Sequence, residues 1–204
     1  QVRIELVLSN ERLDLVAEQI DVALRVGPLP DSSLMARTLA RYRSYVYASE
    51  GYVARYGEPR HPSELVGLPA LANSKDRRGQ RFLWHLRHAQ SGEAIEAEVD
   101  PVAIANDPFV LRNLLADGQG VMLASEFVVC LGPETERPRR ILEEWEGPET
   151  ELHAVFPGGS LISPKVRTFV DFVVERMHMK LQTPINAWQP PAHAAEPEEE
   201  KALA

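Results

Sequence analysis

Few residues of this chain have the type and spacing that chemistry requires. Of the six histidines only His85 and His88 lie close together, and HLRH offers no third metal ligand. On a strand these two side chains also point to opposite faces or lie too far apart to share an ion. No G-x-S-x-G elbow, G-x-G-x-x-G loop or G-x-x-x-x-G-K-(S/T) loop occurs. We therefore predict no catalytic residue, no metal site, no cofactor and no enzyme.

Polar residues suited to holding a small molecule do occur where predicted strands end or a helix begins. Arg25 lies at the carboxyl end of a predicted strand, where its guanidinium could clamp a carboxylate, although a structural ion pair is an equal alternative. Asn73 and Ser74 follow another predicted strand. Asn106 and Asp107 begin a helix, whose free backbone N–H groups favour an anion. Capping by Asp107 itself is the commoner use of such a residue.

These residues need secondary structure that places them together, and the hydrophobic periodicity supplies it. Apolar residues alternate in 2–8 and 20–26 as in strands, and they follow helical spacing in 13–20. Pro108 and Gly118 mark the start and end of a helix. Further along, we expect the following elements: strands 42–48, 69–73, 121–124 and 152–156, a hairpin over 81–99, and helices 50–56 and 163–177.

Alternating strands and helices predict an α/β fold with two lobes and mainly parallel central sheets. Crossovers near residues 43 and 150 make the first lobe discontinuous. We expect the first lobe to comprise residues 1–43 and 150–179 and the second lobe residues 44–149. Residues 180–204 contain prolines and an acidic run and are expected to form a disordered tail.

The bulk composition narrows the possible partners. The 204 residues include 22 basic and 30 acidic side chains, and the net charge of -8 argues against gripping a nucleic acid backbone. The single cysteine, Cys130, excludes an internal disulfide and indicates a reducing compartment, most simply the cytoplasm. No apolar run approaches the 18 or so residues of a membrane helix, and no signal pattern is evident at the amino terminus.

Four blocks of sequence, in order, resemble the effector-binding domain of LysR-type transcriptional regulators. They are IDVALRVGPLPDSSLMARTL from residue 20, SEGYVARYGEPRHPSEL from 49, FVLRNLLADGQGVML from 109 and HAVFPGGSLISPKVRTFVDFVVERM from 153. The resemblance implies two lobes joined by two crossover strands, similar to periplasmic binding proteins, with a ligand cleft between the lobes. It also implies that a first strand and helix of the domain, and a helix-turn-helix further upstream, precede residue 1 in the family.

By this resemblance the cleft lies after the strand ending RVG, after the strand ending ANS and at the helix beginning ND. The effector-binding residues are then expected to be Arg25, Val26, Gly27, Asn73, Ser74, Asn106, Asp107 and Pro157. The expected ligand is a small anionic or aromatic effector. The family assembles as homodimers or tetramers and contacts DNA only through the helix-turn-helix that is absent from this chain.

Two other functions share the two-lobed plan. A free-standing solute-binding protein of a transport system needs export, and an enzyme needs a nucleophile or a metal. The four ordered blocks and the lack of a catalytic constellation favour the regulatory domain.

Overall fold

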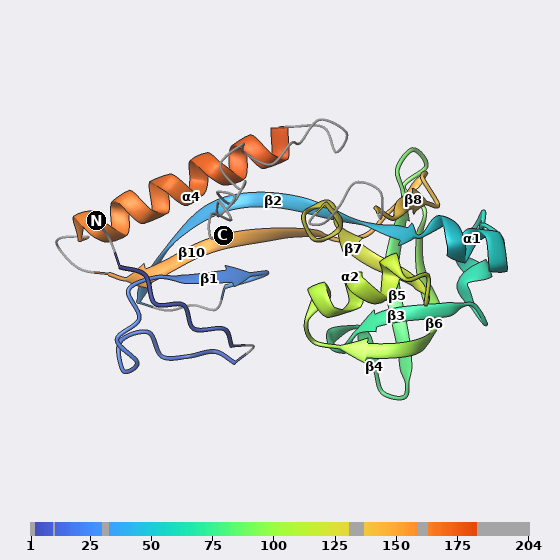
Figure 1. Cartoon of the computed structure of the whole chain (residues 1–204), viewed down its shortest axis with the longest axis horizontal. Helices are drawn as coiled ribbons and strands as arrows, with labels where there is room; N and C mark the ends of the chain where they lie inside the picture. The colour runs from blue at the N-terminus through green and yellow to red at the C-terminus, as the bar shows by residue number, and fades with distance from the viewer. Residues whose placement is uncertain (1–2, 10, 30–32, 131–136, 159–162, 183–204) are drawn as a thin grey trace, which may run out of the picture.

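Two neighbouring strands join two lobes, and the longer of the two runs on into the second lobe (Figure 1). The computed structural model describes residues 3–9, 11–29, 33–130, 137–158 and 163–182, with side chains up to residue 176. The joining strands are β2 (Leu34–Ala48) and β10 (Glu149–Pro157). We call the half that contains β1 and α4 the first lobe, and the half that contains α1, α2 and β3 to β7 the second lobe. The predicted two-lobed α/β architecture is confirmed.

The first lobe consists of a three-stranded antiparallel sheet with one long helix packed on it. Its sheet order is β1 (Ala23–Val26), β10, β2, and its helix is α4 (Pro164–Gln182). Val166 and Val170 recur at helical spacing on α4 and pack on Leu152, Ala154 and Phe156 of β10. The core of this lobe therefore lies between α4 and one face of the sheet.

The second lobe has a mixed sheet with a parallel centre. Its strands are β7 (Val121–Ser125), β3 (Pro69–Asn73), β6 (Ala94–Ala105), β5 (Arg81–His88), β4 (Arg77–Arg78), β8 (Arg139–Ile141) and β9 (Trp145–Glu146). β3 pairs in parallel with both β6 and β7, whereas the predicted hairpin β5–β6 is antiparallel. Helical segments cover this sheet: α1 (Glu50–Tyr56), η1 (Pro62–Leu65), η2 (Ser74–Asp76), α2 (Pro108–Ala116) and α3 (Glu126–Val129).

Alternation along the strands of the second lobe divides its core into two clusters. Val46 and Ala48 of β2 and Ala70 of β3 pack in one cluster, while Tyr47 and Leu71 pack in the other. Successive strand residues point to opposite faces, so both faces of this sheet are buried. The helices α1 and α2 cover it from either side.

At the junction of the lobes, β2 is in close contact with Gly147, which lies just before β10. β2 pairs with β10 up to Arg43 and with β7 from Ser44 onward. The Gly147 N–H donates to the Ser44 carbonyl at 2.7 Å. A Cβ at Gly147 would lie 2.8 Å from Leu123 Cδ1 and 3.1 Å from the Ser44 oxygen. Only glycine fits this junction without displacement.

Two elements expected near the amino terminus are wrong. Residues 3–9 pair with no strand among the described residues, and Ile4, Leu6 and Leu8 are exposed. Residues 13–20 form a turn with hydrogen bonds such as Ile20 N–H to the Leu15 carbonyl, and Gln19 at φ 54° ends it. A strand pattern needs a neighbouring strand to form a ladder, and a helical pattern of two turns is marginal because nucleation is costly. The expected disordered tail falls outside the described residues from residue 183, whereas α4 extends to Gln182.

Candidate functional site

The two polar pairs of the second lobe lie side by side at one edge of its sheet. Asn73 ends β3 and stands opposite Ala105 in the parallel ladder with β6. Ser74 therefore lies beside Asn106 and Asp107, which follow β6. Because parallel strands bring their carboxyl ends to the same edge, the structure places these two predicted pairs next to each other.

At this edge the Asn73 side chain is already used to cap the start of η2. Its Oδ1 accepts the Lys75 N–H at 3.1 Å, and the Asp76 carboxylate accepts the Asn73 N–H at 3.3 Å, which closes a capping box on η2. Burial raises the pKa of the Asp76 carboxyl above its ordinary value, against the opposing effects of Lys75 and the Asn73 N–H. The exposed Ser74 hydroxyl is the more available polar group of this pair.

Asp107 caps α2, as the commoner interpretation held. Its Oδ1 accepts the Phe109 N–H at 2.7 Å and the Val110 N–H at 3.4 Å. The side-chain carboxylate thus occupies the position that a bound anion would take at the helix start. Asn106 is exposed beside it.

The first lobe contributes Arg25, Val26 and Gly27 at the carboxyl end of β1. The Arg25 guanidinium is half-buried and donates to the Leu13 carbonyl at 3.0 Å. It forms no ion pair with any residue that the structure describes. Gly27, at φ 91°, donates its N–H to the Glu151 carbonyl at 2.8 Å and so turns the chain at this point.

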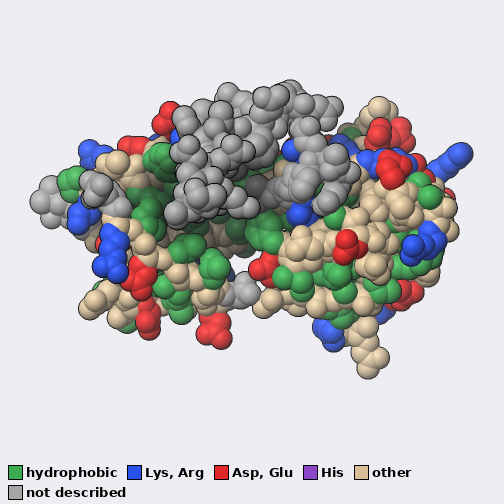
Figure 2. Space-filling model, in the orientation of Figure 1, with side chains coloured by type: hydrophobic (Ala, Val, Ile, Leu, Met, Phe, Trp, Pro, Cys, Tyr) green, Lys and Arg blue, Asp and Glu red, His purple; other side chains and the backbone are tan. Residues whose placement is uncertain are grey.

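The carboxyl end of β1 points toward the second lobe, and β3 ends facing back toward it (Figure 1). The space-filling view shows the surface hollowed between the two lobes, below the connecting strands (Figure 2). Groups from both lobes therefore flank this hollow.

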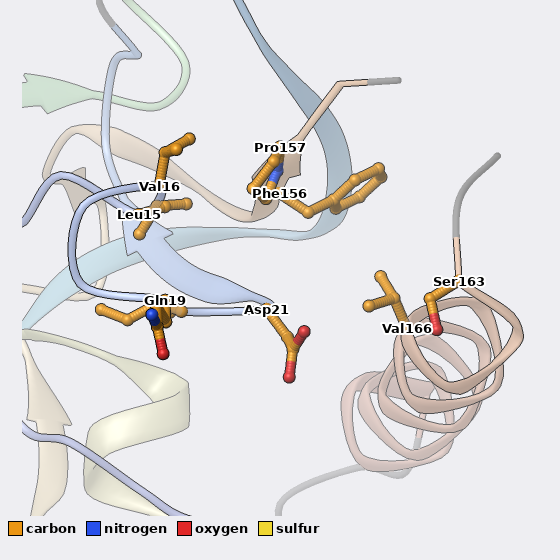
Figure 3. Close-up of a pocket in the computed structure, with 9 residues that line it drawn as sticks. Leu15, Val16, Gln19, Asp21, Phe156, Pro157, Ser163 and Val166 are labelled. Atoms are coloured by element: carbon orange, nitrogen blue, oxygen red, sulfur yellow. The ribbon is translucent and has the colours of Figure 1, made fainter. Parts of the chain in front are cut away.

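Pro157 does not join the other predicted site residues. β10 runs antiparallel to β1, so Val26 lies opposite Leu152 while Pro157 lies opposite Leu34 at the far end of β10. At about 3.3 Å per residue, Pro157 is roughly 17 Å along the strand from the Val26 pair. Its side chain lines a different pocket, within the first lobe (Figure 3).

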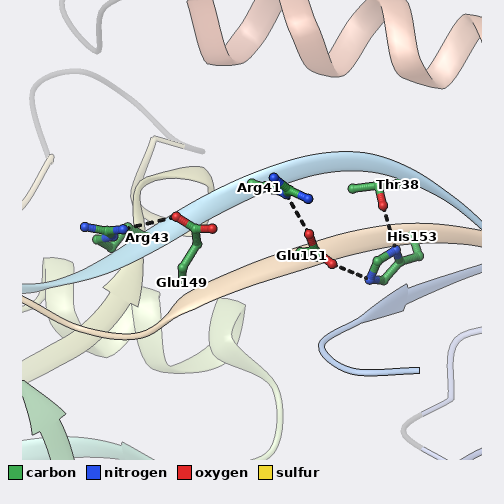
Figure 4. A network of polar contacts seen from close by, with 6 residues as sticks. All are labelled: Thr38, Arg41, Arg43, Glu149, Glu151 and His153. Atoms are coloured by element: carbon green, nitrogen blue, oxygen red, sulfur yellow. Dashed lines mark hydrogen bonds and ion pairs between the residues drawn. The ribbon is translucent and has the colours of Figure 1, made fainter. Parts of the chain in front are cut away.

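The connecting strands carry a row of ion pairs that sequence reasoning missed (Figure 4). Arg41 Nε lies 2.6 Å from Glu151 Oε1, and Arg43 Nη2 lies 3.1 Å from Glu149 Oε2. The other Glu151 oxygen lies 3.3 Å from His153 Nε2. The signal was present, because arginines at two-residue spacing in β2 stand opposite glutamates at the same spacing in β10.

Two further contacts extend this row. Thr38 Oγ1 lies 3.2 Å from His153 Nδ1, and Arg43 also pairs with Glu146 of β9. Hydrogen bonds to Glu146 and then to Glu149 raise the pKa of the Arg43 guanidinium. Arg43 thus ties a strand of the second lobe to the connecting strand that leaves it.

Aromatic rings fill the junction on its other side. Tyr42 of β2 stacks on Phe127 of α3 with centroids 6.3 Å apart, and Phe127 meets Phe109 of α2 edge-on at 6.5 Å. Phe127 packs against the first-lobe cluster although α3 belongs to the second lobe. Burial raises the pKa of Tyr42. Side-chain packing therefore couples the lobes in addition to the strands.

Within the ranges that the structure describes, no group of three or more His, Cys, Asp or Glu side chains is placed to hold a metal ion. Among the described helices none is both long and apolar enough to cross a membrane.

A two-lobed α/β fold with connecting strands and polar strand ends from both lobes around a hollow defines a ligand-binding domain of the periplasmic-binding-protein type. The chain belongs to the LysR substrate binding domain family, whose model matches residues 1–178. The likeness to this family that the four sequence blocks indicated is confirmed.

Known relatives and structures agree with this assignment. An HTH-type transcriptional regulator of Xanthomonas campestris pv. campestris is 43% identical over 180 residues, which cover 87% of this chain and 52% of the relative. The structure of CrgA, a LysR-type transcriptional regulator from Neisseria meningitidis, matches with a TM-score of 0.72 at 28% identity over 86% of this chain and 58% of that one. The CrgA regulatory domain matches with a TM-score of 0.68 at 30% identity, over 82% of this chain and 80% of that domain. The chain spans about half the length of the curated relatives it matches.

Proposed function

We propose that this chain is the sensing part of a bacterial transcriptional regulator. A small effector enters the hollow between the lobes, changes how the lobes are placed, and thereby alters DNA binding by a helix-turn-helix upstream of this domain. The observation that supports the proposal most is the convergence of the ends of β1, β3 and β6 on that hollow. The relatives are transcriptional regulators, which favours regulation over solute transport or catalysis and a cytoplasmic location.

The effector site that we propose comprises Arg25, Val26, Gly27, Ser74 and Asn106. Asn73 and Asp107 are not included as ligand contacts, because their side chains cap the starts of η2 and α2. They hold these helical segments in place beside the proposed site. Pro157 is left out because β10 carries it away from β1.

The effector class follows from the charges at this site. Arg25 has no counter-ion among the described residues, and a guanidinium binds a carboxylate with two parallel hydrogen bonds. The ring of Phe109 is partly exposed at the start of α2 and offers an apolar contact. An anionic effector, with or without an aromatic ring, satisfies both groups.

For the boundaries we propose that the first lobe comprises residues 1–43 and 150–179 and the second lobe residues 44–149. We further propose that the whole regulator is a homodimer or tetramer. Exposed apolar side chains on neighbouring parts of β6 and α2 support an interface there: Val102, Ile104 and Val110.

The test is a thermal-shift screen of this chain with small carboxylates, aromatic acids and matched neutral amides. An effector at 100 times its dissociation constant should stabilise the chain by about 2.7 kcal/mol. Arg25→Gln should weaken the best acid by about tenfold or more, whereas Arg60→Gln, a change at an exposed arginine of the second lobe, should leave it unchanged. Stabilisation by amides as strong as by acids, or an acid that ignores Arg25→Gln, would contradict the proposal.

A further inference from the structure

Three aromatic rings form a chain from the proposed effector site to a strand that joins the lobes. Phe109 follows Asp107 at the start of α2, and its ring meets the Phe127 ring of α3 edge-on, with centroids 6.5 Å apart and an interplanar angle of 74°. The Phe127 ring also stacks on Tyr42 of β2, with centroids 6.3 Å apart and an interplanar angle of 20°. Both centroid distances lie within the range of favourable aromatic pairs, so each neighbouring pair in the chain is attractive.

Tyr42 lies beside the position at which β2 changes its partner strand. It pairs with Thr150 of β10, whereas β2 pairs with β7 from Ser44 onward. Two hydrogen bonds close this junction: the Ser44 N–H donates to the Pro148 carbonyl at 3.2 Å, and the Gly147 N–H donates to the Ser44 carbonyl at 2.7 Å. Any movement of the Tyr42 ring therefore acts close to the junction of the lobes.

The one-turn helix α3 divides its side chains between the lobes. Val128 and Val129 are buried in a second-lobe cluster, whereas Phe127 packs against the first-lobe cluster. Side chains packed at native density do not deform continuously, so a change in the placement of the lobes must move Phe127 relative to Phe109 or to Tyr42. The contacts of this one ring therefore depend on how the lobes are placed.

We propose that Phe109 selects an effector with an aromatic ring and that Phe127 is the positioning residue that holds the Phe109 ring in place for it. This inference rests on the proposed function and narrows the effector from an acid to an aromatic acid. The carboxylate pairs with Arg25, and the ligand ring stacks on Phe109, which is 42% exposed. Phe127 then links the position of that ring to Tyr42 and the junction. An aliphatic acid also pairs with Arg25 but leaves the three rings as they are in the free chain.

The experiment compares phenylacetate with cyclohexylacetate, two acids of equal charge and nearly equal size that differ in the aromatic character of the ring. Isothermal titration calorimetry measures their dissociation constants on the full chain. We expect phenylacetate to bind about fivefold more tightly, because one aromatic pair is gained.

Hydrogen exchange followed by NMR is the second readout, with both acids at equal occupancy. Phenylacetate should slow the exchange of the Ser44 and Gly147 amides, whose hydrogen bonds close the junction, because a held Tyr42 ring stabilises the strand beside them. Cyclohexylacetate should leave the exchange of these two amides unchanged.

Variants of the ring chain assign the preference to its members. Phe109→Leu should abolish the preference for phenylacetate. Phe127→Leu should reduce it to about twofold or less and remove the slowed exchange at Ser44 and Gly147, whereas Phe127→Tyr, which keeps the ring, should retain both effects.

Phe169→Leu is the matched control. Phe169 packs against the same first-lobe cluster as Phe127, and no ring contact joins it to another aromatic side chain of the described residues. This variant should therefore keep the preference and the slowed exchange of the parent.

The inference is overturned if the parent binds the two acids equally tightly, or if Phe127→Leu keeps both the preference and the slowed exchange. It is also overturned if Phe169→Leu has the same effect as Phe127→Leu, because Phe127 would then serve only the core. In each of these cases, binding of both acids that is lost in Arg25→Gln leaves the proposed function standing. If neither acid binds up to millimolar concentration, this inference fails, while the wider screen of acids still decides the proposed function.

Discussion

The two lobes protect their sheets in different ways. In the second lobe, neighbouring residues of β2 and β3 alternate between two buried clusters, so both faces of the sheet are covered. In the first lobe a single cluster lies beneath α4, and ion pairs such as Arg41 to Glu151 occupy positions out of the cluster. A shift of one position along a strand therefore moves a side chain from one face of the sheet to the other, and in the first lobe from core to surface.

The two lobes also differ in how much of their apolar surface is exposed, and the difference is clearest at the edge of the first-lobe sheet. The outer strand of the first lobe, β1, pairs with β10 alone among the described strands and leaves Leu24 50% exposed and Val26 61% exposed. The second lobe instead contains fully buried large side chains such as Trp84 and Tyr52. Regions with fewer buried apolar contacts open at lower free energy, so the first lobe should open before the second.

The largest effect is expected from truncating a buried side chain in the core of each lobe and comparing the losses in the free energy of unfolding. Trp84→Ala should lower the free energy of unfolding by about 3 to 5 kcal/mol, whereas Val170→Ala in the first lobe should cost roughly 1 to 2 kcal/mol. Urea unfolding followed by far-UV circular dichroism measures both. Val66→Ala, at an exposed position, is the control and should stay within about 0.5 kcal/mol of the parent. Equal costs for the two core variants would remove the distinction between the lobes.

A smaller effect is expected at the junction. Gly147→Ala places a Cβ against Leu123 and Ser44 and should cost about 1 to 3 kcal/mol through overpacking. In this variant the amide of residue 147, which in the parent donates to the Ser44 carbonyl, should exchange its hydrogen faster. Gly51→Ala is the matched control because a Cβ there meets nothing within 4 Å. If both alanine variants were equally stable, Leu123 and Ser44 would be able to move away from the added Cβ at little cost, and the junction would not be tightly packed.

The smallest effect concerns Tyr52 at high pH. Burial raises the pKa of Tyr52 to about 12, and its hydroxyl donates to the Pro69 carbonyl at 3.1 Å. Because the folded pKa exceeds the unfolded value of about 10, the stability it contributes is complete below pH 10 and is lost as the pH rises toward 12. Tyr52→Phe should cost about 1 kcal/mol at neutral pH and make unfolding less dependent on pH in that window.

Denaturation at a series of pH values tests this expectation, with Tyr56→Phe, an exposed ring in contact with Tyr52, as the control. The control should retain most of the alkaline loss. Amide exchange above pH 10 should also show that protection falls in the second lobe, which would narrow the difference between the lobes. An unchanged slope in Tyr52→Phe would mean that other groups cause the alkaline loss.

Features set by local sequence were predicted well. The helix α2 begins after Asp107 with Pro108 and ends before Gly118, as its capping residues indicate. The hairpin β5–β6 formed because its alternating apolar residues face one another, with Phe82 opposite Val99. Such signals act within a few residues, so one sequence is enough to detect them.

Features that depend on distant partners were not predicted. The pattern in residues 2–8 carries no information about whether a neighbouring strand is present. The placement of Pro157 depended on the direction of β10, which periodicity does not specify. The pairing of Arg41 with Glu151 depended on register across 110 positions of sequence. Strand direction and register are properties of the assembled sheet rather than of any one segment.

The continuous run of β2 through both lobes has a mechanical consequence. β2 and β10 lie side by side as a hydrogen-bonded pair across much of the span between the lobes. Bending such a ribbon within its own plane would require one strand to slide past the other and break hydrogen bonds, whereas twisting it needs only small changes in φ and ψ. The molecule is therefore stiff to in-plane bending and compliant to torsion, so a ligand held between the lobes would be sensed mainly as a twist.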